Sequence, residues 1–283
     1  MEVYGGIMDN EMKIQPPVPV VRQNGWLKVL SIAAVLYIIL LLILVLTVNP
    51  IIFPTVVMVG NFMVPVAFVV FLYERRYFSH LTPQTVSLAF LYGGLVGVIA
   101  ASILWALFIR NLDLVSTLKI GFIEEFAKIL GVVAIARHKW HDSEMDGLIL
   151  GAAVGMGFAA LESTGYAFAA FLQSNGSISA AVEITLLRGL LSPMMHGTWT
   201  AILASVLFRE SRNGRFRINP YVIGAYVFVS ILHSMWNAAN MVLELGVLIA
   251  LGVIGFIGLF VLKFCWQDAI RLQTVMQLEN EDV

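Results

Sequence analysis

Long apolar runs alternate with short polar stretches along the whole chain. Each run has roughly the 20 residues that a helix needs to cross a bilayer, and a helix satisfies its own backbone hydrogen bonds in hydrocarbon. Turn-forming pairs such as Asn49-Pro50 and Asn219-Pro220 separate the runs. We therefore predict an all-α, polytopic membrane helix bundle with about eight transmembrane helices. The runs are Val29–Val48, Ile51–Leu72, Val86–Ile109, Leu114–Ile135, Gly147–Leu172, Ile184–Phe208, Tyr221–Val242 and Leu245–Phe264.

The composition supports this prediction and disfavours other classes of protein. The 283 residues are 59% apolar and 12% charged, whereas a soluble domain is close to half apolar and about a quarter charged. A soluble globule, a disordered chain and a nucleic-acid-binding protein are all disfavoured. The formal net charge of −1 provides no general attraction for nucleic acid. The single cysteine, Cys265, excludes an internal disulfide and a cysteine-rich zinc site.

The positions of the basic residues predict the orientation of the chain. If the N-terminus lies inside, 13 of the 17 lysines and arginines fall on the cytoplasmic side, and only Arg110 falls on the outer side. The remaining three, Lys119, Lys128 and Arg188, lie within the runs. This asymmetry follows the positive-inside rule. We predict a multi-pass protein of the cell membrane with both termini in the cytoplasm.

Ionisable residues divide the chain into parts with different expected roles. Residues 1–28 form a predicted cytoplasmic N-terminal tail, and residues 29–113 hold three transmembrane helices that we interpret as a frame. Residues 114–242 hold four helices with charges near mid-depth, where each costs roughly 2.5–3.5 kcal/mol. We interpret these four helices as a catalytic core. Residues 243–283 provide the last transmembrane helix and a cytoplasmic C-terminal tail.

The fourth run carries the densest group of charges. It reads Glu124-Glu125-x-x-Lys128, with the two glutamates at its centre. Lys128 follows them by four and three residues, so it can form an ion pair with either glutamate. One carboxylate would then be neutralised while the other stays free, and this difference allows one of them to act as a base. A purely structural ion pair would account for Lys128 and one glutamate, but not for the second.

The next three runs each place one polar group at a similar depth. Glu162 lies near the middle of the fifth run, His196 in the middle of the sixth, and His233 near the centre of the seventh with Asn237 one turn later. Structural polar residues would be expected to scatter in depth, so the common depth indicates one site. Arg188 lies nearer the outer surface and could partner an acidic side chain or a lipid headgroup. The glycines of Gly147-x-x-x-Gly151-x-x-x-Gly155 predict close helix packing.

Two kinds of hydrolytic chemistry suit carboxylates and two imidazoles in an apolar cavity. One is a zinc-type site, with two histidines and one glutamate as ligands and a further glutamate as base. The other is free of metal: a glutamate activates water, and histidine and asparagine donate to the developing oxyanion. Both predict hydrolysis of a carbonyl compound, most plausibly a peptide bond, inside the membrane.

Taken together, these motifs resemble the PrsW family of intramembrane proteases, in the superfamily that includes CAAX prenyl proteases and bacteriocin-immunity-type homologues. The resemblance covers roughly residues 114–242. It rests on Glu124-Glu125-x-x-Lys128, Phe158-x-x-x-Glu162, His196 and His233-x-x-x-Asn237. In the CAAX branch the first motif usually ends in Arg one residue later, and the second carries His at the position of Glu162. Both departures point to the PrsW branch.

The resemblance implies a role for each site residue. Glu124 and Glu125 would supply the general base, with Lys128 tuning it, and spacing does not decide between the two glutamates. Glu162, His196 and His233 would be metal ligands or water-polarising groups, and Asn237 would be the oxyanion donor. The cofactor would be zinc, with a metal-free mechanism as the other possibility. Substrates would be membrane-anchored proteins, such as single-span regulators of signalling.

Two other hypotheses compete with an intramembrane endopeptidase. A proton- or ion-coupled transporter or channel would also place carboxylates and histidines in the membrane, but it predicts inverted repeats, and no repeat is evident in the sequence. A catalytically inactive scaffold is the third possibility, although the complete set of polar positions argues against it. Under each hypothesis the chain contacts the lipid bilayer and no nucleic acid.

Overall fold

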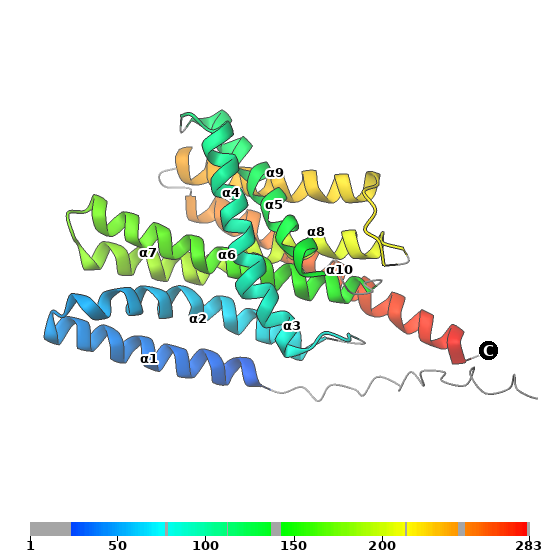
Figure 1. Cartoon of the computed structure of the whole chain (residues 1–283), viewed down its shortest axis with the longest axis horizontal. Coiled ribbons are helices and arrows are strands. Elements are labelled where there is room, and N and C mark those ends of the chain that lie inside the picture. The colour runs from blue at the N-terminus through cyan, green and yellow to red at the C-terminus, as the bar shows by residue number, and fades with distance from the viewer. Residues whose placement is uncertain are drawn as a thin grey trace, which may run out of the picture.

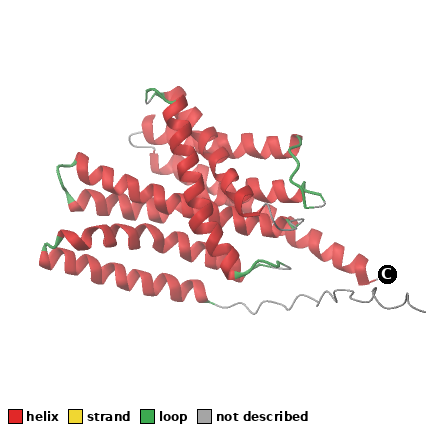
Figure 2. Ribbon diagram, viewed as in Figure 1, coloured by secondary structure: helices red, strands yellow, loops and turns green. Residues whose placement is uncertain are grey.

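The computed structural model describes residues 24–76, 79–111, 113–136, 143–212, 214–242 and 247–281. Over those ranges the regular elements are all helices (Figures 1 and 2), as predicted. In chain order they are α1 (Gly25–Thr47), η1 (Pro50–Ile52), α2 (Phe53–Glu74), α3 (Pro83–Leu88), η2 (Ala89–Gly93), α4 (Gly94–Phe108), α5 (Leu114–Ala136), α6 (Glu144–Gln173), α7 (Ile178–Leu191), η3 (Ser192–Met194), α8 (His196–Arg209), α9 (Pro220–Val242) and α10 (Val247–Glu281).

Each predicted apolar run corresponds to a helical segment of this bundle. Seven segments in the described ranges are long and apolar enough to cross a bilayer. The remaining run, the fourth, corresponds to α5, which has the necessary length of 23 residues but differs from the other seven in its four charged residues, two lysines and two glutamates. The multi-pass membrane bundle is therefore confirmed, and the long helix that falls outside these seven segments is the one with the densest group of charges.

The two described ends of the chain lie on the same side of the bundle. The first turn of α1 and the end of α10 share this side with the α2–α3 and α8–α9 loops (Figure 1). This agrees with an even number of crossings. Which side faces the cytoplasm stays a prediction. Residues 1–23 of the predicted tail, with Lys13 and Arg22, lie outside the described residues, as do Arg137 and Lys139.

Helix α6 occupies the centre and packs most extensively against α8, with further contacts to α2, α4 and α7. Its glycines allow the close approach to α8. A Cβ on Gly151 would lie 2.5 Å from the backbone oxygen of Thr200, and one on Gly155 would overlap the backbone oxygen of His196. The predicted packing role of these glycines is thus confirmed. The same contact holds the start of α8 against α6.

The sixth run is broken where the sequence contains Pro193. Helix α7 ends at Leu191, a 3₁₀ turn follows, and α8 begins at His196. Proline has no backbone N–H to donate and clashes with the preceding turn, so the α-helix is interrupted here. His196 is therefore the first residue of a new helix rather than the middle of a continuous one.

Other runs differ from the predicted boundaries in smaller ways. Pro65 lies inside α2, which nevertheless runs unbroken. The third run contains a π-helical stretch, η2, between α3 and α4. Helix α10 continues to Glu281, beyond the predicted end of the last run at Phe264, because polar residues can extend a helix outside the hydrocarbon.

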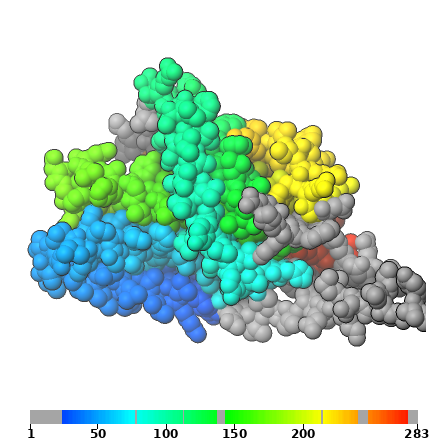
Figure 3. Space-filling view, viewed as in Figure 1, coloured from blue at the N-terminus to red at the C-terminus, as the bar shows by residue number. Residues whose placement is uncertain are grey.

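The outer helices expose apolar side chains, as expected for contact with lipid. Figure 3 shows α1 and α2 along one edge of the molecule and α4 crossing the viewed face. Leu46 of α1 and Leu107 of α4 are among the exposed residues. The polar site lies inward of this apolar surface.

Candidate active site

The charged residues of α5 form a buried cluster. Glu124, Glu125 and Lys128 are each at most 2% exposed. Lys128 Nζ lies 2.7 Å from Glu125 Oε1 and 3.7 Å from Glu124 Oε2. The lysine thus bonds directly to one glutamate and only approaches the other, which is the unequal arrangement that the spacing predicts.

Two further helices complete the surroundings of Glu125. Nδ1 of His233, on α9, lies 2.9 Å from Glu125 Oε1, and the hydroxyl of Thr200, on α8, donates to Glu125 Oε2 at 3.4 Å. The ring of Trp199 packs against the His233 ring at 4.9 Å between centroids. Both oxygens of Glu125 are therefore engaged. If His233 Nδ1 donates its proton to Glu125, its Nε2 keeps a free lone pair, 3.5 Å from Glu124 Oε2.

The second histidine contacts the same lysine. Nδ1 of His196 lies 2.7 Å from Lys128 Nζ, and its ring centroid is 5.1 Å from that of His233. This contact exists in two forms. If the ammonium of Lys128 donates, the His196 proton resides on Nε2, which then acts as a donor. If Nδ1–H donates to a neutral amine, Nε2 has a free lone pair.

Glu162 is held by an arginine rather than by a histidine alone. Its Oε2 lies 2.6 Å from Nη2 of Arg188, on α7, and 3.3 Å from Nε2 of His196. Arg188 also donates through Nε to Ser163. The sequence left the partner of Arg188 open between an acidic side chain and a lipid headgroup, and here the partner is acidic. Glu162 is thus charge-paired at the edge of the cluster.

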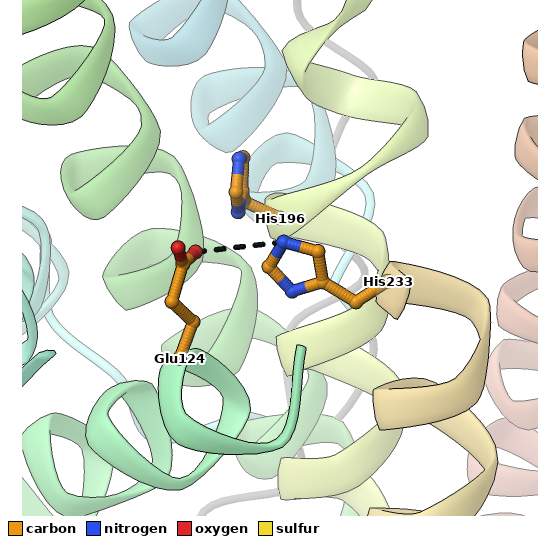
Figure 4. A group of neighbouring side chains, drawn as sticks. All are labelled: Glu124, His196 and His233. Carbon is orange, nitrogen blue, oxygen red and sulfur yellow. Dashed lines mark ion pairs between the residues drawn. The ribbon is translucent and has the colours of Figure 1, made fainter. Parts of the chain in front are cut away.

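A different carboxylate from the one expected joins the two histidines. Glu124, His196 and His233 each present a ligand-type atom, and these atoms all lie within 4.8 Å of one another. The side chains converge from α5, α8 and α9 (Figure 4). This is the only such group in the described part of the chain. The ligand set implied by resemblance contained Glu162 in place of Glu124, and here Glu162 is paired with Arg188 instead.

The donor set fits a divalent metal ion of the zinc type. One carboxylate and two imidazoles are common zinc ligands, and an open position remains for water. Glu124 Oε2 is buried and forms no hydrogen bond to any described residue, and the nearest acceptor to His196 Nε2 is Glu162 Oε2 at 3.3 Å. The fit requires the form of the His196–Lys128 contact that leaves Nε2 unprotonated. In that form Lys128 is neutral, so three ionised carboxylates and the guanidinium of Arg188 leave an excess negative charge that a divalent cation would offset.

A cavity of about 510 Å³ opens onto this cluster. Its polar lining includes Glu124, Glu162, His196 and His233, together with Asn237 from α9. Its apolar lining comes largely from α7 and α10, with Leu187 and Leu251 as examples. Substrate and water therefore have space beside the buried polar atoms.

The structure brings all seven predicted site residues to one region. Glu124, Glu162, His196, His233 and Asn237 line the cavity, while Glu125 and Lys128 lie behind them in contact with the histidines. The sequence prediction missed Thr200 and Trp199. Thr200 follows His196 by four residues, which places both on one face of α8, so this spacing was the available signal.

Comparisons with known proteins agree with this arrangement. The model of the family described as PrsW family intramembrane metalloprotease matches residues 82–263. "Protease PrsW" of Halalkalibacterium halodurans is 29% identical over 177 residues, which are 61% of this chain and 77% of that protein. No solved structure matches the chain. Nothing in these comparisons favours the transporter hypothesis, and the wider CAAX and bacteriocin-immunity superfamily stays a prediction.

Proposed function

The chain belongs to the PrsW family of intramembrane metalloproteases. On that premise we propose that it hydrolyses peptide bonds of membrane-anchored proteins, with Glu124, His196 and His233 as its catalytic site. One observation carries the proposal: these three buried residues present their polar atoms to one another at the wall of a cavity. One of those atoms, Glu124 Oε2, lacks a hydrogen-bond partner among the described residues. Buried polar atoms without partners are costly, which supports a functional reason for keeping them.

In the metal-bound version, Glu124, His196 and His233 hold the ion. A zinc ion at this position would lower the pKa of a bound water and polarise the substrate carbonyl. Glu125 orients His233 by accepting from Nδ1, so that Nε2 faces the site. Carboxylate–histidine pairs of this kind commonly orient metal ligands. In the form of the His196 contact that this version requires, Lys128 is a neutral amine, and it donates an N–H to Glu125 Oε1 at 2.7 Å.

The Lys128–His196 contact supports a second, metal-free version. With Lys128 as an ammonium ion, His196 Nε2–H is a donor, and Glu124 is the one carboxylate of α5 without a direct bond from the lysine. Glu124 would then take a proton from water as the water oxygen attacks the carbonyl carbon, and would return that proton to the leaving amine. His196 would donate to the carbonyl oxygen as negative charge develops on it.

Asn237 has the same role in both versions. Its side chain lines the cavity beside His233, one helical turn away on α9. A side-chain amide can donate to an oxyanion without a change in its own charge. We assign Asn237 as the oxyanion donor. Its expected effect is on the rate of the chemical step rather than on substrate binding.

The expected substrate is a protein with a single membrane-spanning segment. Apolar side chains of α7 and α10 line the cavity, so an apolar segment would be accommodated next to the polar cluster. An active site within the bilayer also selects substrates that are themselves membrane-anchored. Regulators of signalling remain one proposed group within that class.

Purified protein and a fluorescent single-span reporter peptide provide the test. We expect His233→Ala to abolish cleavage, whereas His80→Ala, a change at an exposed histidine, should leave the rate unchanged. A His233→Ala protein that cleaves at the wild-type rate would contradict the proposed site. Metal analysis separates the two versions: bound zinc and reversible inhibition by a chelator support the first, and cleavage by metal-depleted protein supports the second.

A further inference from the structure

Arg188 is held rigidly at the wall of the same cavity. Its Nη2 donates to Glu162 Oε2 at 2.6 Å and its Nε to Ser163 Oγ at 3.2 Å. The guanidinium also lies over the Tyr166 ring, 3.9 Å from its centroid. Three contacts on α6 thus fix a side chain that projects from α7. A flexible or lipid-anchored arginine would not need this support.

The contacts with α6 leave some N–H donors of the guanidinium without a hydrogen bond to a described residue. An arginine has five N–H donors, and the contacts to Glu162 and Ser163 engage Nη2 and Nε. The Nη1 group forms no hydrogen bond to a described residue, and the side chain of Arg188 is 22% exposed where it lines the cavity. Donors therefore remain for a molecule in the cavity.

These donors lie close to the reacting groups. Arg188 Nη2 and His196 Nε2 both approach Glu162 Oε2, at 2.6 and 3.3 Å, so they are separated by at most the sum of these distances, 5.9 Å. Successive Cα atoms of a peptide are about 3.8 Å apart. A peptide bound at His196 therefore places a neighbouring backbone carbonyl within reach of Arg188.

We propose that Arg188 is a substrate-binding residue whose free N–H groups donate to a backbone carbonyl of the peptide next to the scissile bond. This inference rests on the proposed peptidase function. Glu162 already neutralises the charge of Arg188, so the remaining donors suit a neutral acceptor rather than an acidic side chain. Glu162 has a positioning role, because it holds the guanidinium at the cavity wall.

A purely structural role for Arg188 makes a different prediction. If Arg188 only neutralises Glu162, its removal matters solely because a carboxylate is left unpaired in the membrane. In a Glu162→Gln background that penalty is absent. A second substitution, Arg188→Met, should then have no further effect on substrate binding. The double variant contains neither charge of this ion pair, so no unpaired charge is left to destabilise it. Thermal unfolding checks that it is folded.

The experiment is a four-protein comparison of wild type, Arg188→Met, Glu162→Gln and the double variant. The probe is the fluorescent single-span reporter peptide in detergent micelles, with its Kd measured by anisotropy and its KM and kcat by cleavage. We expect Arg188→Met to raise Kd and KM about ten-fold, the effect of losing a hydrogen bond to a charged group. The increase should also be present in the Glu162→Gln background, because the amide oxygen of the glutamine can still accept from the guanidinium. The effect on kcat should be smaller.

Two outcomes would overturn the inference, and they are distinct from failure of the proposed function. An unchanged Kd and KM between Glu162→Gln and the double variant would show that Arg188 only neutralises Glu162. A wild type that does not bind the reporter would also contradict it. If the wild type binds the reporter without cleaving it, the peptidase proposal fails, while the Kd values still decide the role of Arg188.

Discussion

Helices α1 and α5 have the same length, 23 residues, and opposite designs. Helix α1 has two buried side chains, Tyr37 and Leu44, and no acidic residue. Helix α5 has ten buried residues, among them Glu124, Glu125 and Lys128. Contact with lipid favours a helix whose faces are all apolar, whereas a polar site inside the bundle requires charged residues, which lower the hydropathy of the helix. The helix that least resembles a membrane span is therefore the most informative about function.

The largest expected effect comes from removing the cation of α5. Lys128→Met leaves two buried carboxylates without their cation, and breaking a buried pair costs about 3–5 kcal/mol. We expect the thermal midpoint in detergent to fall sharply and reporter cleavage to cease. Lys119→Met, at an exposed lysine of the same helix, is the matched control and should resemble wild type. If the two variants had the same thermal midpoint, Lys128 would not be needed to neutralise the buried carboxylates.

Within α1, the prediction concerns packing alone. Leu44 is 1% exposed and Leu42 is 54% exposed, although only one residue separates them. Leu44→Ala should lower the free energy of unfolding by about 2 kcal/mol or more, because it opens a cavity, whereas Leu42→Ala should change it by less than about 0.5 kcal/mol. Chemical unfolding in mixed micelles measures both. If the two losses are equal, α1 does not pack on α2 through one face.

A smaller effect is expected where α5 meets α9. A Cβ on Gly121 would lie 2.4–2.8 Å from atoms of Ser230 and Ser234, which the pair of backbones cannot admit without moving apart, and the nearest of these atoms is the hydroxyl oxygen of Ser234. Gly121→Ala should cost about 1–3 kcal/mol and reduce cleavage, because Glu125 moves away from His233. Gly224→Ala, on α9 with no neighbour within 4 Å, is the control. A stable, fully active Gly121→Ala protein would show that this spacing is not required.

The smallest effect concerns the start of α5. The Asp113 carboxylate accepts from the Ser116 backbone N–H at 2.7 Å, and this hydrogen bond lowers the pKa of Asp113 below its usual value. The folded state thus favours the ionised form, so the stabilisation is present above the unfolded-state pKa and is lost as pH falls through the folded-state pKa. Asp113→Asn should lower the thermal midpoint slightly at neutral pH. The difference from wild type should shrink in acid, and a difference that grows would contradict this account.

The sequence was sufficient to predict the helical class, the spans and the residues that gather at the site. Apolar runs report directly on burial in lipid, and the common depth of His196 and His233 reflects a real shared position. Helical spacing within α5 is also sufficient to predict that Lys128 pairs with a glutamate, although it does not select Glu125 over Glu124. These features depend on the spacing of residues along the chain, which can be read directly from the sequence.

Features that depend on how helices rotate against one another could not be predicted. Arg188 and Glu162 lie on different helices, 26 residues apart, and no periodicity indicates that they meet. Glu162 is thus paired with Arg188 as well as lying 3.3 Å from His196, and Glu124 is the carboxylate that groups with both histidines. The division of residues 29–113 and 114–242 into frame and core stays a proposal, because α6 of the proposed core packs directly on α2 and α4.

Cleavage of the single-span reporter by a Glu124→Gln protein tests the central claim most directly. The substitution keeps the size of the side chain and removes its capacity to bind metal or accept a proton. The account predicts a loss of roughly 10²–10⁴-fold in rate with an unchanged thermal midpoint, while Glu183→Gln, at an exposed glutamate of α7, cleaves normally. A folded Glu124→Gln protein that cleaves at the wild-type rate would contradict the account.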